Sequence, residues 1–271
     1  MSSCPPIVLT FAASDPTGGA GLQADLLTIA AMGCHPLSVL TALTVQDTSG
    51  VDSVQAVDAE RVRAQAEALL ADMRVAAFKL GVLGSAENMR VIADLLSELP
   101  GVPVVLDPVL ASGRGDPLAS AQIVAALREL IVPQATVVTP NSLEARRLAA
   151  MENDDEPDLD ECARRLLALG CEYVLVTGAH EATDEVINTL YGARGVVRED
   201  RWERLPGAYH GSGCTLSSAI AAALANGRAV PEAVRDAQEY TWQALAAGFR
   251  AGAGQLLPDR FFWARELESE R

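Results

Sequence analysis

The stretch Tyr209-His210-Gly211-Ser212-Gly213-Cys214-Thr215-Leu216-Ser217-Ser218 contains a glycine-rich turn that runs directly into an apolar helix, predicted at residues 219–225. The first amides of a helix have no carbonyl partners, and glycines let the backbone close around a bound anion. The positive end of the helix dipole favours a thiolate at Cys214, which predicts a general base for a substrate hydroxyl and a site of phosphoryl transfer. The ordinary alternative is a glycine-capped buried helix with an inert cysteine.

Strand and helix patterns alternate along the chain. Short, β-branched apolar runs predict strands buried on both faces at residues 7–12, 102–106, 136–138 and 173–176. Amphipathic patterns predict helices at residues 21–32, 58–73, 85–98, 120–130, 143–149 and 158–169. This alternation predicts an α/β fold, a three-layer α/β/α sandwich with a mainly parallel central sheet, in a single domain over residues 1–271.

Two segments depart from that alternation. Residues 36–57 are broken by Asp47-Thr48-Ser49-Gly50, which predicts a strand pair that could cover a pocket. Asp58 has the side chain of an N-cap, and Pro157 followed by acidic residues suits the first turn of the next helix. The acidic run 152–161 is therefore interpreted as a solvated loop and helix start, in preference to a metal site.

Composition excludes several classes of protein. The chain has 271 residues, 49% of them hydrophobic, and a net charge of −15, which argues against a nucleic-acid partner. Lys79 is the only lysine, so no P-loop Gly-Lys-Ser/Thr motif exists. The five cysteines form no Cys-x-x-Cys pair, which favours a reducing cytoplasm. No apolar run approaches the roughly 18 residues of a membrane-spanning helix.

Polar residues follow two of the predicted strands. Asp107 comes directly after a buried run, at the end of a strand where open α/β sheets place their ligands. Asn141 and Glu144 follow another strand and are spaced so that both can face one side of a helical turn. Together these oxygen-bearing side chains suit hydrated Mg²⁺ beside a nucleotide. Considered one at a time, each residue has an ordinary structural alternative: Asp107 would belong to a turn, and Asn141 would cap a helix.

Other motifs bear on ligand binding. Gln46 carries a donor and an acceptor that could pair with the edge of a heteroaromatic ring, although an exposed strand glutamine is the ordinary alternative. The segment Gly19-Ala20-Gly21-Leu22-Gln23-Ala24 formally matches a dinucleotide fingerprint. Residues 13–18 separate it from the preceding strand, which instead favours a loop across the strand ends, with Asp25 aimed back towards it. We interpret His180 and His210 as structural hydrogen-bonders, and no zinc site is predicted.

Together these residues resemble the hydroxymethylpyrimidine/phosphomethylpyrimidine kinases of thiamine biosynthesis, in the ribokinase-like superfamily. The likeness spans nearly the whole chain, and its signposts are Ser14-Asp15-Pro16-Thr17-Gly18-Gly19-Ala20-Gly21-Leu22-Gln23-Ala24-Asp25, Gln46-Asp47-Thr48, Lys79-Leu80-Gly81, Leu106-Asp107-Pro108-Val109, Thr139-Pro140-Asn141 with Glu144, and His210-Gly211-Ser212-Gly213-Cys214-Thr215-Leu216-Ser217. The first and last of these motifs are specific to this family, whereas the others occur throughout the superfamily. Most sugar and nucleoside kinases of the superfamily carry an aspartate base where this chain has Cys214, so the cysteine points to the pyrimidine kinases and close pyridoxal kinase relatives.

The resemblance implies transfer of the ATP γ-phosphate to the hydroxymethyl group of 4-amino-5-hydroxymethyl-2-methylpyrimidine, followed by a second phosphorylation to the pyrophosphate. It implies Mg²⁺, ATP as co-substrate, and a homodimer. For the pyrimidine, the resemblance implies that Asp25 and Gln46 hold the ring and that Ala20, Val82 and Val109 pack against its faces.

For the phosphoryl transfer, it implies that Cys214 takes the hydroxyl proton and that the amides of Gly211, Ser212 and Gly213 stabilise the transferred phosphoryl group. It further implies that Asp107, Asn141 and Glu144 organise Mg²⁺ and water, and that Thr177 and Gly178 lie near the nucleotide.

The chain departs from the family pattern at two places. Val82 replaces the usual methionine beside the ring, and Thr177-Gly178-Ala179 replaces the usual lysine-glycine-glycine, so Thr177 cannot supply a cationic phosphate contact. Two other functions stay open. One is a pyridoxal or pyridoxine kinase of the same superfamily, although Gln46 and Asp25 favour the aminopyrimidine. The other is a non-catalytic pyrimidine- or nucleotide-binding sensor, which would have no need of a positioned base.

Overall fold

A computed structural model describes residues 4–111, 119–151 and 157–264. The described strands form one sheet in the order β3-β2-β1-β4-β5-β6-β7-β8-β9. Neighbouring strands from β2 to β7 run parallel, whereas β3, β8 and β9 pair antiparallel at the two edges. The strands are β1 (Ile7–Ser14), β2 (His35–Gln46), β3 (Val51–Ala56), β4 (Ala77–Leu80), β5 (Val104–Leu106), β6 (Val137–Val138), β7 (Tyr173–Thr177), β8 (Glu185–Gly192) and β9 (Gly195–Glu203).

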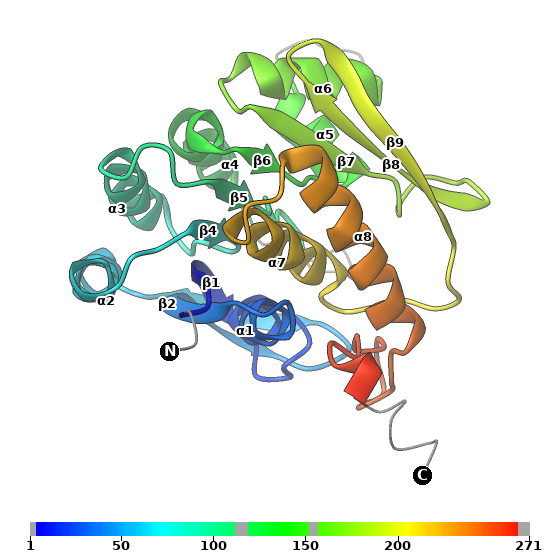
Figure 1. The fold of residues 1–271 in the computed structure, drawn as a ribbon, viewed down its shortest axis with the longest axis horizontal. Coiled ribbons are helices and arrows are strands. Elements are labelled where there is room, and N and C mark those ends of the chain that lie inside the picture. The colour runs from blue at the N-terminus through cyan, green and yellow to red at the C-terminus, as the bar shows by residue number, and fades with distance from the viewer. Residues whose placement is uncertain (1–3, 112–118, 152–156, 265–271) are drawn as a thin grey trace.

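Helices cover both faces of the sheet (Figure 1). One face carries α1 (Gly21–Ala31), α7 (Ser212–Ala225) and α8 (Val230–Ala246). The other carries α2 (Ala59–Asp72), α3 (Ala86–Ser97), α4 (Ala121–Ala126), α5 (Ser142–Ala149) and α6 (Leu159–Ala168). The predicted α/β/α sandwich is therefore confirmed. Strand β4, helix α8 and the hairpin of β8 and β9 were not predicted from the sequence patterns.

The helix predicted at residues 120–130 is only partly regular. It begins as α4 and continues as a π-helical turn, Leu127–Ile131, and a 3₁₀ turn, Val132–Gln134. Pro133 has no amide hydrogen to donate to the preceding turn, so a regular α-helix cannot pass through it. The irregular turns still bury Leu127 and Ile131 against the sheet.

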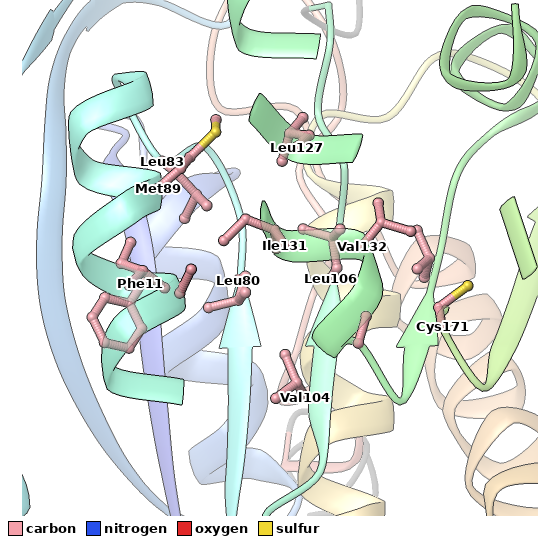
Figure 2. Packing of buried hydrophobic residues seen from close by; sticks show 14 of the residues in the cluster. Phe11, Leu80, Leu83, Met89, Val104, Leu106, Leu127, Ile131, Val132 and Cys171 are labelled. Atoms are coloured by element: carbon pink, nitrogen blue, oxygen red, sulfur yellow. The ribbon is translucent and has the colours of Figure 1, made fainter. Parts of the chain in front are cut away.

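The larger apolar core lies between the sheet and the helices α2 to α6. Figure 2 shows Leu80 and Leu106, from neighbouring strands, packed with Ile131 of the irregular turn. The second core lies on the opposite face, where Ile220 of α7 and Val234 of α8 pack against the strands and α1. A sheet buried on both faces explains why its parallel strands are nearly continuous apolar runs.

Several local predictions can be compared with the structure. The strand pair predicted within residues 36–57 is confirmed as β2 and β3, and the Asp47 carboxylate accepts from the amides of Ser49 (2.7 Å) and Gly50 (3.1 Å) in the turn between them. Asp58 caps α2 as predicted. In the acidic run, Asp158 caps α6, whereas residues 152–156 lie outside the described part of the chain. Among the described helices, none is long and apolar enough to cross a membrane.

Candidate active site

The carboxyl ends of the parallel strands meet at one edge of the sheet, and the predicted site residues gather there. Asp107 directly follows β5, Val82 comes shortly after β4, and Asn141 follows β6. Helix α7 packs against β1, β4 and β5 and begins at the same edge. Ligand sites of open α/β sheets form at such strand ends.

The glycine turn brings the start of α7 against the loop after β1. Gly211 adopts a left-handed conformation with φ of 80°, and a Cβ atom on it would lie 1.9 Å from the carbonyl oxygen of Gly19. Only glycine fits this position. A Cβ atom on Gly213 would lie 3.7 Å from both carboxylate oxygens of Asp107. The first turn of α7 therefore faces Asp107.

Helix α7 begins at Ser212, so the prediction of a helix over residues 219–225 placed its start too late. Ser212, Gly213 and Cys214 belong to its first turn. The hydroxyl groups of Thr215 and Ser217 donate to the carbonyl oxygens of Gly211 (2.8 Å) and Gly213 (2.9 Å), which lets these polar residues lie inside a helix.

A buried ion pair lies beneath the site. The Lys79 ammonium lies 2.8 Å from Oδ1 and 3.0 Å from Oδ2 of Asp25, and neither side chain has exposed surface. The hydroxyl groups of Thr10 (2.7 Å) and Ser218 (2.8 Å) also donate to Asp25. Burial alone would lower the pKa of Lys79, but the charge of Asp25 helps to hold it above its usual value. These donors occupy both carboxylate oxygens of Asp25, which leaves little room for a direct contact with a substrate. The predicted role of Asp25 in holding the pyrimidine stays a prediction.

Asp107 and Cys214 lie beside that ion pair. The Ser217 hydroxyl lies 3.4 Å from Oδ2 of Asp107, and burial raises the pKa of Asp107 despite the nearby Lys79. Burial also raises the pKa of the Cys214 thiol to about 12, because the charge of Lys79 only partly compensates and the carboxylates oppose ionisation. Desolvation thus opposes the thiolate that the helix dipole was predicted to favour, and the role of Cys214 as a base stays a prediction.

Asn141 and Glu144 form a capping box at the start of α5. The Asn141 side chain accepts from the amides of Leu143 and Glu144, both at 3.0 Å, while Glu144 accepts from the amide of Asn141 at 2.9 Å. The other oxygen of Glu144 accepts from the amide of Leu110 at 3.2 Å. Burial and the charge of Asp107 raise the pKa of Glu144 to about 8. The helix-cap interpretation of Asn141 is confirmed, and its metal role stays a prediction.

The predicted nucleotide residues lie next to Asn141. The Thr177 amide donates to the Pro140 carbonyl at 3.0 Å, and Thr177 pairs with Asn141 across the ends of β7 and β6. A Cβ atom on Gly178 would lie 2.3 Å from the Ile187 carbonyl oxygen, so a glycine is required there. The structure thus brings Asn141, Thr177 and Gly178 together.

The predicted pyrimidine residues lie at or just beyond the ends of β1, β2, β4 and β5. Ala20 is the N-cap residue of α1, and its amide donates to Asp15 at 2.7 Å. Val82 and Val109 are half-buried just beyond the ends of β4 and β5. Gln46 lines an open groove of about 420 Å³, together with Pro16, Thr17, Asp47, Thr48, Ser49, Ala251, Gly252 and Ala253. Gln46 is therefore neither fully exposed nor part of the core.

Sequence reasoning gave no role to Asp15, which organises the loop after β1. Its carboxylate accepts from the amides of Thr17 (2.8 Å) and Ala20 (2.7 Å), and its Oδ2 lies 2.8 Å from Nε2 of His210. Burial alone would raise the pKa of Asp15, but these partners lower it to about 2. Asp15 thus ties this loop to the residue before the glycine turn. A structural hydrogen-bonding role was predicted for His210, and it is confirmed.

Comparisons with known proteins agree with this geometry. A family model described as phosphomethylpyrimidine kinase matches residues 15–259. A hydroxymethylpyrimidine/phosphomethylpyrimidine kinase of Streptomyces coelicolor is 44% identical over 92% of each chain. Among solved structures, an ADP complex of Bacillus subtilis pyridoxal kinase has a TM-score of 0.86 at 30% identity, covering 96% of this chain and 99% of that one. A phosphomethylpyrimidine kinase from Clostridium difficile has a TM-score of 0.76 at 33% identity, covering 89% and 99%.

A mainly parallel sheet between two helical layers, with a glycine-rich helix start at its carboxyl edge, defines a ribokinase-like small-molecule kinase. The family match extends from Asp15 to Asp259 and includes every candidate site residue. The chain belongs to the phosphomethylpyrimidine kinase family.

Proposed function

We propose that the protein transfers the γ-phosphate of ATP to the hydroxymethyl group of 4-amino-5-hydroxymethyl-2-methylpyrimidine, and then phosphorylates the monophosphate to the pyrophosphate, in thiamine biosynthesis. The observation that carries the proposal is the first turn of α7 facing the Asp107 carboxylate, with Cys214 in the same turn. Phosphoryl transfer needs positioned donors and electrostatic stabilisation more than covalent chemistry. The amides of Gly211, Ser212 and Gly213 supply such donors.

Cys214 has the role of accepting the substrate hydroxyl proton. Burial raises the pKa of this thiol, so the role needs the bound substrates to favour proton transfer to it. A loose phosphoryl-transfer transition state makes a small demand on the base, since bond making to the nucleophile lags behind bond breaking. Orienting the hydroxyl towards the phosphoryl group is accordingly the larger part of the role proposed for Cys214.

The proposal includes Mg²⁺, held by Asp107 and Glu144 with Asn141 beside them. These residues fit the ion, because the charge of Asp107 disfavours ionisation of the buried Glu144 carboxyl and a cation would relieve that cost. Each Glu144 oxygen already accepts from one amide, so this carboxylate suits an outer contact through water. When bound, the ion would neutralise charge on the nucleotide phosphates.

The aminopyrimidine would lie between Ala20, Val82 and Val109, with Gln46 paired to polar atoms at the ring edge. The open groove supports the role of Gln46 alone, because Ala20, Val82 and Val109 do not line it. Asp25 would help to hold the pyrimidine, with its carboxylate fixed by the buried ion pair with Lys79. Thr177 and Gly178 would face the nucleotide, with Thr177 contributing no positive charge.

Pyridoxal kinase activity is the second candidate, favoured by the close structural match to pyridoxal kinases. The higher identity to pyrimidine kinases makes it the lesser one. Release of ADP should be measured with the aminopyrimidine, its monophosphate and pyridoxal, and ³¹P NMR would identify each product. We expect the two pyrimidines to turn over at least tenfold faster than pyridoxal. Faster turnover of pyridoxal would reverse the order of the candidates, and pyrimidine binding without any turnover would indicate a sensor.

The proposal also covers the protein as a whole: a single kinase domain over residues 1–271 that acts as a homodimer in the cytoplasm, with no nucleic-acid partner. The net charge of −15 supports the last point, because such a surface repels phosphate backbones. Light scattering behind size-exclusion chromatography tests the dimer, and a mass of one chain would contradict it.

A further inference from the structure

Arg260 is a buried arginine in the segment that follows α8. It is 4% exposed, and its backbone is fixed because the Tyr240 hydroxyl donates to its carbonyl oxygen at 2.9 Å. The preceding residue, Asp259, donates its amide to the Ala244 carbonyl at 2.9 Å. This segment is also joined to the glycine turn, since the His210 amide donates to the Leu256 carbonyl at 2.9 Å. Arg260 is therefore held in place from both sides.

The Arg260 guanidinium joins the two loops of the candidate site. One end, Nη2, donates to the Gly19 carbonyl at 2.5 Å, and Nη1 lies 3.4 Å from the Gly18 carbonyl. On the other side, Nε donates to the Thr215 hydroxyl at 3.2 Å. One rigid fork thus binds the loop after β1 and the first turn of α7 together.

The contact of Nη2 lies where these loops are closest. A Cβ atom on Gly211 would lie 1.9 Å from the same Gly19 oxygen that accepts from Arg260. The Thr215 hydroxyl that accepts from Nε itself donates to the Gly211 carbonyl at 2.8 Å. Arg260 therefore reaches both partners of the Gly19–Gly211 contact, one directly and one through Thr215.

The three acceptors of the guanidinium are neutral, two carbonyl oxygens and a hydroxyl. Burial lowers the pKa of Arg260, yet arginine stays charged in proteins. Its hydrogen-bond partners carry no charge, and the carboxylates of Asp25 and Asp15 act on the guanidinium without a direct hydrogen bond.

We propose that Arg260 is a positioning residue for phosphoryl transfer, which locks the loop carrying Ala20 against the anion-binding turn of α7. The inference rests on the proposed function and deepens it. Substrate and phosphoryl group would be held by different loops, so their spacing depends on this lock. A displacement of about 1 Å in such a site can lower the rate by about a hundredfold.

Two substitutions of Arg260 distinguish the effect of its planar guanidinium from the effect of its positive charge. Arg260→Lys keeps the charge but loses the planar fork, and Arg260→Gln loses both. We expect kcat with the aminopyrimidine to fall about 10-fold in Arg260→Lys and about 100-fold in Arg260→Gln. The KM values for both substrates should change less than threefold. Arg250→Lys is the matched control, because Arg250 is exposed in the same C-terminal region and, among the described residues, donates to the Gly254 carbonyl and to no part of either site loop.

Hydrogen–deuterium exchange supplies a readout that needs no substrate. The amides of Gly19 and Ala20 donate to Thr17 and Asp15. They should exchange at least tenfold faster in Arg260→Lys than in the wild type, and at the wild-type rate in Arg250→Lys. If the wild type turned over no pyrimidine, the proposed function would fail while exchange still tested the lock. Wild-type kcat or wild-type exchange in folded Arg260→Lys would overturn the inference.

Thr215→Val covers the case in which neither Arg260 variant folds. It keeps Arg260 and removes one of its acceptors, together with the bond from Thr215 to Gly211. We expect kcat to fall about threefold to tenfold, with faster exchange in the same loop. An unchanged rate and unchanged exchange in this variant would equally overturn the inference.

Discussion

Substituting Gly213 by alanine should separate stability from activity. Gly213 lies exposed in the first turn of α7, and its new Cβ atom would make ordinary contacts of 3.7 Å with the Asp107 oxygens. Nothing in the fold has to move. Alanine is also favoured over glycine in helices by up to about 1 kcal/mol, so the free energy of unfolding should stay unchanged or rise by up to that amount.

The same methyl group should damage catalysis. It would stand between the first amides of α7 and the Asp107 carboxylate, in the space proposed for the transferred phosphoryl group. The amides themselves are kept, but a methyl group that keeps the phosphoryl group away from them should cost as much as losing one oxyanion-type donor, about a hundredfold to a thousandfold in kcat. We expect a fall of at least a hundredfold for Gly213→Ala.

Gly211→Ala is the matched substitution two residues earlier. A left-handed conformation costs an alanine about 1–2 kcal/mol, and the clash with the Gly19 carbonyl forces the two loops apart. This variant should lose at least about 2 kcal/mol of stability as well as its activity.

Urea denaturation and initial rates of ADP release would be measured on both variants and the wild type. Wild-type turnover in Gly213→Ala would refute the placement of the phosphoryl group, whatever its stability. Wild-type stability in Gly211→Ala would refute the argument from backbone conformation.

Four further predictions concern single side chains. Cys214→Ala should lower turnover about a hundredfold with little loss of pyrimidine binding, and a variant with wild-type turnover would show that Cys214 is not the base. Gln46→Leu should weaken pyrimidine binding by about 1–3 kcal/mol, so equal affinities in calorimetry would place Gln46 outside the site. Glu144→Gln should shift the Mg²⁺ titration of turnover to higher metal with a lower plateau, and a superimposable curve would remove Glu144 from the metal site. Asp15, whose pKa is lowered to about 2, should contribute about 2 kcal/mol above pH 4 and lose that contribution as the pH falls towards 2. In urea denaturation, Asp15→Asn should therefore be less stable than wild type at pH 7 and nearly equal at pH 2; a constant difference would contradict this.

The fold was predictable where a single rule of pattern applies. Buried parallel strands are continuous apolar runs, so β1, β5, β6 and β7 could be recognised. Strand β4 was missed because it has only four residues and one of them is Lys79, a residue type rarely buried. The hairpin of β8 and β9 was missed because its outer strand is charged and largely exposed.

The site was predictable only in part, for a related reason. Asp107 and Asn141 follow strands, and the ends of parallel strands must meet at one edge, so their approach follows from local patterns. The partners of Asp25 do not follow from such patterns, since Lys79 and Ser218 lie 54 and 193 residues away along the chain. The pKa of Cys214 depends on the same packing, so the burial that opposes its thiolate does not follow from the helix start alone.

The buried position of Lys79 has a practical consequence for labelling. Because it is the only lysine and has no exposed surface, amine-selective reagents find no lysine on the folded protein. Acylation of Lys79 then requires the sheet to open, so its rate would report the population of open molecules directly. One native side chain would thus serve as a built-in probe of unfolding.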